Sequence, residues 1–199
     1  MRLYVTQLSP FARMARIVVL EKKLERRVEI IQAKTRTADS PYYRINPSGR
    51  VPYLVRDDGV GMEESELICA YLGRPEFAIP APDDWAMRRL YGFARSLIDG
   101  VSVWNRELAR PENERSPTVI GHEAARAARM ADLWEKEIEH PLLRGRFDLL
   151  QLTLACALAL EARNSQFRWR EGRPKLAAWF APIAARPSFV ATAPSLPLR

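Results

Sequence analysis

The chain has 199 residues, 47% of them hydrophobic and 28% charged, which is typical of a folded protein with one large domain or two small ones. Its formal net charge is +7, but the basic residues are spread along the chain without a basic tail or a recognised nucleic-acid motif, so we do not expect a nucleic-acid partner. No apolar run approaches the roughly 20 residues that span a bilayer, and residues 1–8 are too short and too polar for a signal peptide. These features predict a cytoplasmic protein without a membrane partner.

The first 75 residues alternate short strand and helix signals. Leu3 to Thr6 is a short apolar run that fits a buried strand. Ser9-Pro10 then predicts the start of a helix, because serine is a good N-cap and proline suits the first helical position. Residues 27–33 predict a second strand, and a loop with a short helix follows, up to Asn46-Pro47.

Two further strands and a helix complete this part of the chain. Residues 51–56 predict the third strand, Asp57-Asp58-Gly59 a hairpin turn, and residues 61–63 a short fourth strand. A helix begins at Ser65 and ends at Gly73. The order β-α-β-α-β-β-α predicts a small mixed α/β domain over residues 1–75.

The remainder of the chain indicates a different architecture. Residues 76–82 contain two prolines and no periodic pattern, so we expect an interdomain linker there. Residues 83–199 are predicted to form an all-helical domain, with helices starting at Asp83 or Asp84, over 116–140, over 147–162 and over 174–185, and a last turn from Arg186. Asp148 and Gln151 have capping-box spacing at the start of the apolar third helix.

The two cysteines, Cys69 and Cys156, lie far apart, each in an apolar stretch with helical periodicity. The sequence has no Cys-x-x-Cys pair and no Cys/His cluster with the spacing of metal ligands. We therefore expect two buried thiols and no metal.

Three segments of the N-terminal half carry a recognisable pattern: Ser9-Pro10-Phe11-Ala12-Arg13, Asn46-Pro47-Ser48-Gly49-Arg50-Val51-Pro52 and Glu64-Ser65. With residues 147–152, 174–179 and 186–188 in the second half, the whole chain resembles the glutathione S-transferase superfamily, in its serine-type form. The resemblance implies a thioredoxin-like N-terminal domain, a helical-bundle C-terminal domain, glutathione as co-substrate and a homodimer. One departure is Gln151, where the family usually has Asp. We expect it still to accept the capping hydrogen bond.

Ser9 is the expected catalytic residue, because the glutathione thiol must lose its proton to become a nucleophile. A hydroxyl that donates a hydrogen bond to the sulfur, at a helix N-terminus, favours the thiolate. Two alternatives remain open at this point: Ser9 serves only as a helix cap, or Tyr4 of the first strand holds the sulfur. A serine cannot form the mixed disulfides of a thioltransferase, so reductase chemistry is disfavoured.

The resemblance also implies a set of glutathione-binding residues. The Val51-Pro52 bond is cis in this fold, and the Val51 backbone is expected to pair with the cysteinyl backbone of glutathione as a short strand would. Glu64 suits the γ-glutamyl ammonium and Ser65 the γ-glutamyl carboxylate. Arg50 and, more weakly, Lys34 are expected to bind the glycyl carboxylate, and Phe11 is also expected to belong to the glutathione-binding set.

The resemblance implies conjugation of glutathione to a hydrophobic electrophile. Tyr91, Arg95 and Trp104 are candidates for the lining of the electrophile pocket, and the alternative is that they belong to the core. The alternative function is a non-catalytic adaptor on the same scaffold, such as a stress regulator that binds RNA polymerase. The basic charge keeps this alternative open, whereas the retained site residues favour the enzyme.

Overall fold

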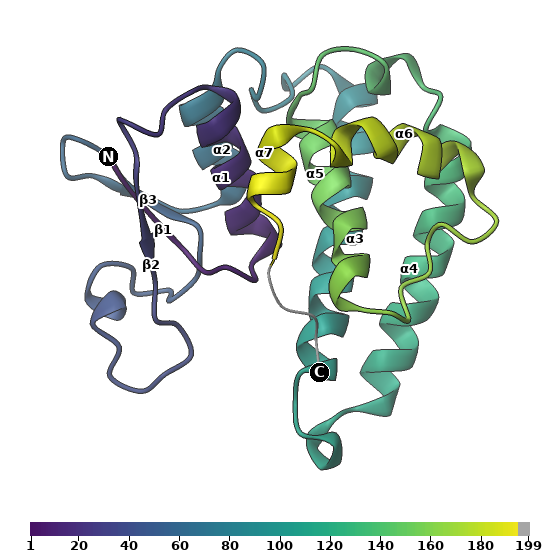
Figure 1. Ribbon diagram of the computed structural model, residues 1–199, viewed down its shortest axis with the longest axis horizontal. Coiled ribbons are helices and arrows are strands. Elements are labelled where there is room, and N and C mark those ends of the chain that lie inside the picture. The colour runs from purple at the N-terminus through teal and green to yellow at the C-terminus, as the bar shows by residue number, and fades with distance from the viewer. Residues whose placement is uncertain (195–199) are drawn as a thin grey trace. The chain divides into compact units, whose positions relative to one another are not determined.

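The computed structural model in Figure 1 describes residues 1–194. The described chain divides into two compact units, one of residues 1–79 with 191–194 and one of residues 80–190. The change from the first unit to the second, at Ile79 and Pro80, falls within residues 76–82. The first unit is thioredoxin-like and the second is mostly helical, as the sequence predicts.

A four-stranded mixed sheet forms the centre of the first unit. Its strands are β1 (Arg2–Val5), β2 (Glu29–Gln32), β3 (Tyr53–Val55) and β4 (Gly61–Met62). They lie in the order β2-β1-β3-β4, with β1 and β2 parallel and the other two pairs antiparallel. All four predicted strands are present: β1 is shifted by one residue from its predicted run, and the other three are shorter than theirs.

Two helices of the first unit, α1 (Pro10–Glu21) and α2 (Ser65–Gly73), pack against each other on one side of the sheet (Figure 1). In β1, Leu3 and Val5 are fully buried, and Tyr4 between them points to the opposite face because side chains alternate along a strand. That face is covered by the short 3-10 helix η1 (Pro41–Arg44), whose Tyr42 lies against Tyr4. The sheet is therefore covered on both faces.

Five α-helices make up the second unit or reach its end: α3 (Trp85–Leu108), α4 (Pro117–Glu137), α5 (Leu149–Leu158), α6 (Pro174–Ala184) and α7 (Pro187–Ala191). Short 3-10 helices join them: η2 (Glu112–Glu114), η3 (Pro141–Leu143) and η4 (Ala159–Arg163). All ten residues of α5 are buried, which confirms the central apolar helix predicted from the sequence.

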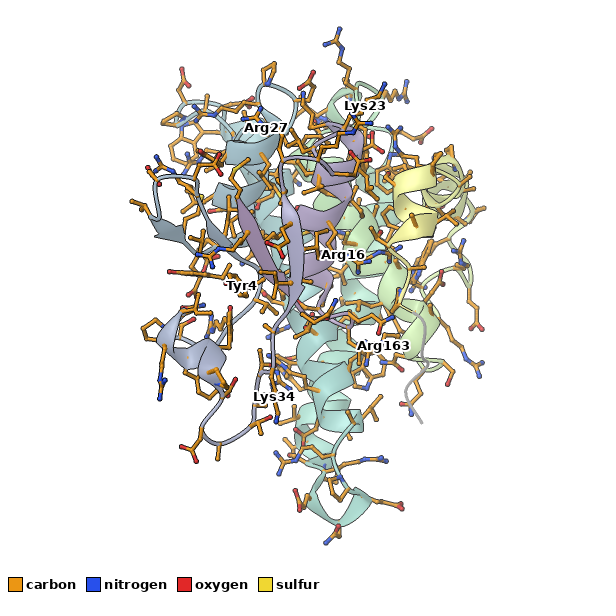
Figure 2. All side chains as sticks on the ribbon, turned by 60° about the vertical axis from the view of Figure 1, so that its left-hand side comes forward. Tyr4, Arg16, Lys23, Arg27, Lys34 and Arg163 are labelled. Atoms are coloured by element: carbon orange, nitrogen blue, oxygen red, sulfur yellow. The ribbon has the colours of Figure 1, made fainter. Side chains whose placement is uncertain are left out.

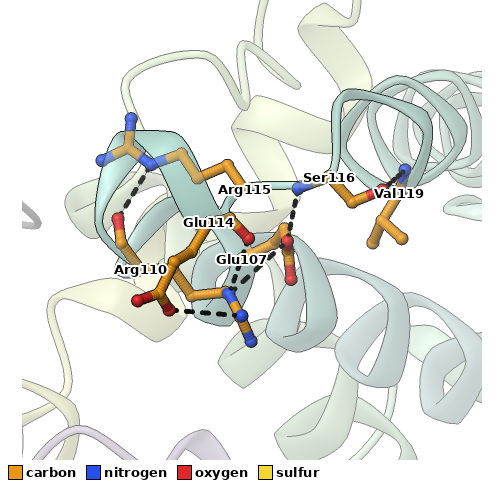
Figure 3. A network of polar contacts seen from close by, with 6 residues as sticks. All are labelled: Glu107, Arg110, Glu114, Arg115, Ser116 and Val119. Atoms are coloured by element: carbon orange, nitrogen blue, oxygen red, sulfur yellow. Dashed lines mark hydrogen bonds and ion pairs between the residues drawn. The ribbon is translucent and has the colours of Figure 1, made fainter.

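A polar network fixes the turn from α3 to α4 (Figure 3). The Glu107 carboxylate accepts the backbone N–H of Ser116 at 2.6 Å, and the Ser116 hydroxyl in turn accepts the N–H of Val119 at 3.3 Å. Between them, Arg110 Nε donates to the carbonyl of Glu114 at 3.0 Å. Ser116 is therefore the N-cap of α4, at the position where the sequence predicts this helix to begin.

One prediction about the start of α5 is wrong. Asp148 caps the helix by accepting the N–H of Gln151 at 2.9 Å, as expected, but the Gln151 side chain does not accept a hydrogen bond in return. Its Nε2 donates to the carbonyl of Arg146 at 2.9 Å. A carbonyl is only an acceptor, so the amide turns its N–H toward it, which an aspartate at this position could not do.

Candidate functional site

The register of the sheet brings the three predicted motifs to one end of the first unit. Tyr4 pairs with Tyr53 in antiparallel β1 and β3, so the residues before Tyr53 lie beside those that follow Tyr4 and lead to Ser9. Leu54 pairs with Met62 in antiparallel β3 and β4, so the residues after Met62 run beside those before Leu54. The β1–α1 corner, the segment before β3 and the start of α2 therefore share one end of the sheet.

Ser9 lies at the N-cap of α1, with extended backbone angles and a half-buried side chain. Its Oγ accepts the N–H of Ala12 at 3.2 Å. This capping bond uses a lone pair of the oxygen and leaves the hydroxyl proton to be donated elsewhere. The first turn of α1 holds no acidic residue that would offset the positive end of the helix dipole. The capping role and the thiolate-stabilising role are thus compatible at this residue.

The Val51-Pro52 bond is cis, as the resemblance implies. Pro52 is buried and Val51 is half-buried. Within residues 1–194, neither the N–H nor the C=O of Val51 makes a hydrogen bond. The Val51 backbone therefore has a donor and an acceptor that an extended ligand can use.

The helix α2 begins at Ser65, as predicted, and the residue at its N-cap position is Glu64. Ser65 is the first helical residue and is buried, whereas Glu64 occupies the N-cap position. Glu64 has φ 74° and ψ 119°, a region that is costly for a residue with a side chain, and its exposed carboxylate makes no capping hydrogen bond. The carboxylate is thus held at the surface, at the shared end of the sheet, without a capping hydrogen bond to the helix.

The two candidate cations, Lys34 and Arg50, are both exposed and make no ion pair within the described residues. Lys34 lies on the loop after β2 (Figure 2), and because β2 runs parallel to β1 this loop leaves the sheet at the same end as the β1–α1 corner. Arg50 directly precedes Val51. Phe11 is half-buried in the first turn of α1.

Tyr4 is placed less favourably than Ser9 for contact with a sulfur. It is 5% exposed and packs on Tyr42 with 5.6 Å between the ring centroids, in a cluster with Val55. Its ring lies on the face of the sheet that η1 covers, whereas Ser9 begins the helix on the other face. Burial in this cluster favours a core role for Tyr4.

The three candidates for the electrophile pocket lie in different surroundings. Trp104 is 2% exposed and packs edge-on against Phe167, with 6.3 Å between ring centroids, so it belongs to the core of the helical unit. Tyr91 is also buried. Arg95 lies 3.8 Å from Asp99, one turn further along α3. None of the three is assigned a role in the site.

Sequence reasoning missed a network beneath the Arg50–Val51 peptide. The Tyr42 hydroxyl and Asn46 Nδ2 both donate to the carbonyl of Arg50, the second at 3.0 Å. Ser48 Oγ donates to Glu63 Oε2 at 2.6 Å. Asn46 and Ser48 lie inside the quoted motif, but neither residue type indicates by itself which carbonyl it will bind.

The part of the chain that the structure describes has neither a cluster of metal-binding side chains nor a membrane-spanning helix. Across residues 1–194, no three His, Cys, Asp or Glu side chains are grouped so that they could hold a metal ion. No helix in that range has both the length and the hydrophobicity needed to cross a bilayer.

The chain is similar to proteins of one kind throughout. The family model "Glutathione S-transferase, N-terminal domain" matches residues 8–74. An uncharacterised GST-like protein of Escherichia coli strain K12, YibF, is 29% identical over 202 residues, which cover 98% of both chains. A glutathione transferase family member from Pseudomonas fluorescens Pf-5, solved with bound glutathione, has a TM-score of 0.85 and 27% identity over 98% of this chain and 99% of its own. A glutathione S-transferase from Methylobacillus flagellatus KT, also with glutathione bound, has a TM-score of 0.81 and 28% identity over 97% and 98%.

Proposed function

Because the chain belongs to the glutathione S-transferase superfamily, we propose that it binds glutathione and activates its thiol for attack on a hydrophobic electrophile. The homodimer and the cytoplasmic location expected from the sequence belong to the same proposal. One observation carries it: the sheet register gathers Ser9, Val51-Pro52 and Glu64-Ser65 at one end of the thioredoxin-like unit.

Binding follows from the chemistry of the tripeptide. The cysteinyl backbone pairs with the unbonded N–H and C=O of Val51. The γ-glutamyl ammonium contacts the Glu64 carboxylate, and the γ-glutamyl carboxylate lies at the N-terminus of α2, beside Ser65. Arg50 and, more weakly, Lys34 on the loop after β2 provide positive charge for the glycyl carboxylate.

Activation requires that the bound thiol ionise more readily than a free one. A thiol with a pKa near 8.5 is mostly protonated at neutral pH, and lowering that pKa by about two units needs roughly 2.7 kcal/mol of preference for the thiolate. A hydroxyl hydrogen bond to the charged sulfur contributes about 1.5–3 kcal/mol, and the N-terminus of α1 adds up to about 1 kcal/mol. Ser9 and its helix together are sufficient for this shift.

The conjugation forms one bond to sulfur, and each proton and electron pair in it is accounted for. The thiol proton leaves to water, and the sulfur uses its electron pair to form a bond with an electrophilic carbon of the second substrate. Either a leaving group departs with its own electron pair, or an addition product takes a proton from water. No step needs a metal or an oxidant.

The variant Ser9→Ala tests the catalytic role. We expect turnover with an activated aryl chloride to fall at least about tenfold, which corresponds to about 1.4 kcal/mol of lost transition-state stabilisation. Glutathione affinity, measured by calorimetry, should change little. Unaltered turnover would remove Ser9 from the mechanism.

A matched control separates catalysis from helix capping. Ser116 caps α4 as Ser9 caps α1, with its Oγ on the N–H of the third residue along. Ser116→Ala should lose a similar stability, about 1 kcal/mol, and keep full turnover. An equal loss of turnover in both variants would mean that Ser9 acts only as a cap.

The adaptor alternative makes a different prediction for binding. A chain that keeps a working glutathione site is retained on glutathione–agarose and eluted by free glutathione. A chain that uses the scaffold only as an adaptor flows through, and that result would contradict the proposal.

A further inference from the structure

The carbonyl of Arg50, next to Val51 of the candidate site, accepts hydrogen bonds from two side chains. It accepts the Tyr42 hydroxyl, which comes from η1, and Asn46 Nδ2 at 3.0 Å. Both donors are on buried residues, with Tyr42 4% and Asn46 2% exposed. Two donors from different positions hold this oxygen in one direction.

The direction of that carbonyl fixes the direction of the next N–H. The Arg50 C=O and the Val51 N–H belong to one peptide unit, and this unit is trans, since it is not among the cis bonds of the chain. In a trans peptide the C=O and N–H point in opposite directions. With the Arg50 oxygen held toward Tyr42 and Asn46, the Val51 N–H must point away from them.

The loop that carries this peptide is itself tied down. Asn46 Oδ1 accepts the N–H of Ser48 at 3.2 Å, and Ser48 Oγ accepts the N–H of Arg50 at 3.1 Å while it donates to Glu63. Gly49 has φ +68°, and a Cβ there would lie 2.8 Å from the ring of Tyr43. The loop thus has little freedom to rotate the Arg50–Val51 peptide.

We propose that Tyr42 and Asn46 are positioning residues, which orient the Arg50–Val51 peptide so that the Val51 N–H meets the cysteinyl carbonyl of glutathione. This inference rests on the proposed function and adds to it two residues that do not touch the tripeptide. They act on affinity by preorganising one donor, so that binding does not have to stop a peptide unit from rotating.

The two donors keep their protons in any ordinary assay. Burial raises the pKa of Tyr42 above its usual value of 10, and the Asn46 amide does not titrate. Loss of either donor should therefore weaken glutathione binding equally at all pH values from 6 to 8. A defect in thiol ionisation, by contrast, varies with pH.

Tyr42→Phe is the test variant, because it removes the hydroxyl and keeps the ring. Tyr43→Phe is the matched control, since Tyr43 lies in the same 3-10 helix. Its hydroxyl accepts the N–H of Thr37 at 3.2 Å and does not bind the Arg50 carbonyl. Asn46→Asp is the second test variant: it keeps the acceptor for Ser48 and loses the donor to Arg50.

Two readouts distinguish positioning from a general loss of structure. Calorimetry gives the glutathione dissociation constant, and NMR gives the exchange rate of the Val51 amide with and without saturating glutathione. We expect Tyr42→Phe to raise the dissociation constant about threefold to tenfold, to reduce the protection of the Val51 amide by glutathione, and to leave the thiol pKa of bound glutathione unchanged. Asn46→Asp should change both readouts in the same direction, and Tyr43→Phe should change neither.

The outcomes that overturn the inference are specific. The wild-type chain could bind glutathione while Tyr42→Phe and Asn46→Asp show the same affinity and the same protection of the Val51 amide. That result would leave the proposed function standing and remove the positioning role. Equal losses in Tyr43→Phe would show a general effect of η1 and also remove it. If the wild-type chain itself does not bind glutathione, the proposed function fails first, and the inference falls with it.

Discussion

At the start of α2, Glu64 combines a costly backbone conformation with a carboxylate that makes no capping hydrogen bond to its own helix. A non-glycine residue in this region costs on the order of 1–3 kcal/mol and persists only where its surroundings hold it. Asp or Ser would satisfy the helix terminus better. The proposed contact with the positively charged γ-glutamyl ammonium would account for a glutamate at this position.

Glu64→Ala should therefore weaken glutathione binding, by roughly 2 kcal/mol or more, if the carboxylate contacts the γ-glutamyl ammonium. Glu66→Gln is the control, because it removes a second negative charge from the first turn of the same helix. Titration calorimetry on both variants provides the measurement. Equal affinity in Glu64→Ala and the wild-type chain would exclude this contact.

Individual residues also show how far the sequence could be interpreted. Ser9 is found at the predicted N-cap, because its role depends only on the three residues that follow it. Tyr42 and Asn46 were missed as site residues, because their common acceptor is a carbonyl whose orientation depends on the folded loop. Local capping could be predicted, whereas the target of a buried side chain could not.

At the scale of the element, the cap of α5 combines a favourable hydrogen bond with an unfavourable burial. Asp148 accepts the N–H of Gln151, but burial raises the pKa of its carboxyl from 3.8 to about 6. The folded chain thus holds this proton more tightly than the unfolded chain does. The stabilisation of the folded state by this tighter proton binding is fully present below pH 3.8 and is lost as the pH rises through about 6.

Asp148→Asn should keep the capping oxygen and remove this pH dependence. We expect its free energy of unfolding to exceed that of the wild-type chain at pH 7, and this excess to fall by about 1–3 kcal/mol as the pH is lowered to 4. Urea unfolding at pH 4, 5, 6 and 7 measures it. Asp84→Asn, at the exposed cap of α3, is the control for loss of a charge from a solvated cap. A constant difference across this range would contradict the account.

Elements were predicted better than their ends and their pairing. The helices follow from periodicity and caps, and α2 covers the predicted residues. The strands are only two to four residues long, so their apolar runs could not define where the ladder stops. The pairing of β1 with β3, which brings the site residues together, joins segments about 50 residues apart. A local sequence pattern does not predict which residues of such distant segments pair.

For the molecule as a whole, the sequence predicts a thioredoxin-like half followed by a helical half, and the structure confirms both. The homodimer stays a prediction. Sedimentation velocity should give twice the chain mass of 22.8 kDa at micromolar concentration. A species of 22.8 kDa that persists at that concentration would contradict it.

The most direct test of the central claim is the pKa of glutathione bound to the wild-type chain, followed by the ultraviolet absorbance of its thiolate as the pH is raised. We predict that the bound thiol titrates about two units below the free thiol, whose pKa is near 8.5, and that Ser9→Ala removes most of this shift. A bound thiol that titrates with the free one would contradict the claim that the β1–α1 corner activates the sulfur.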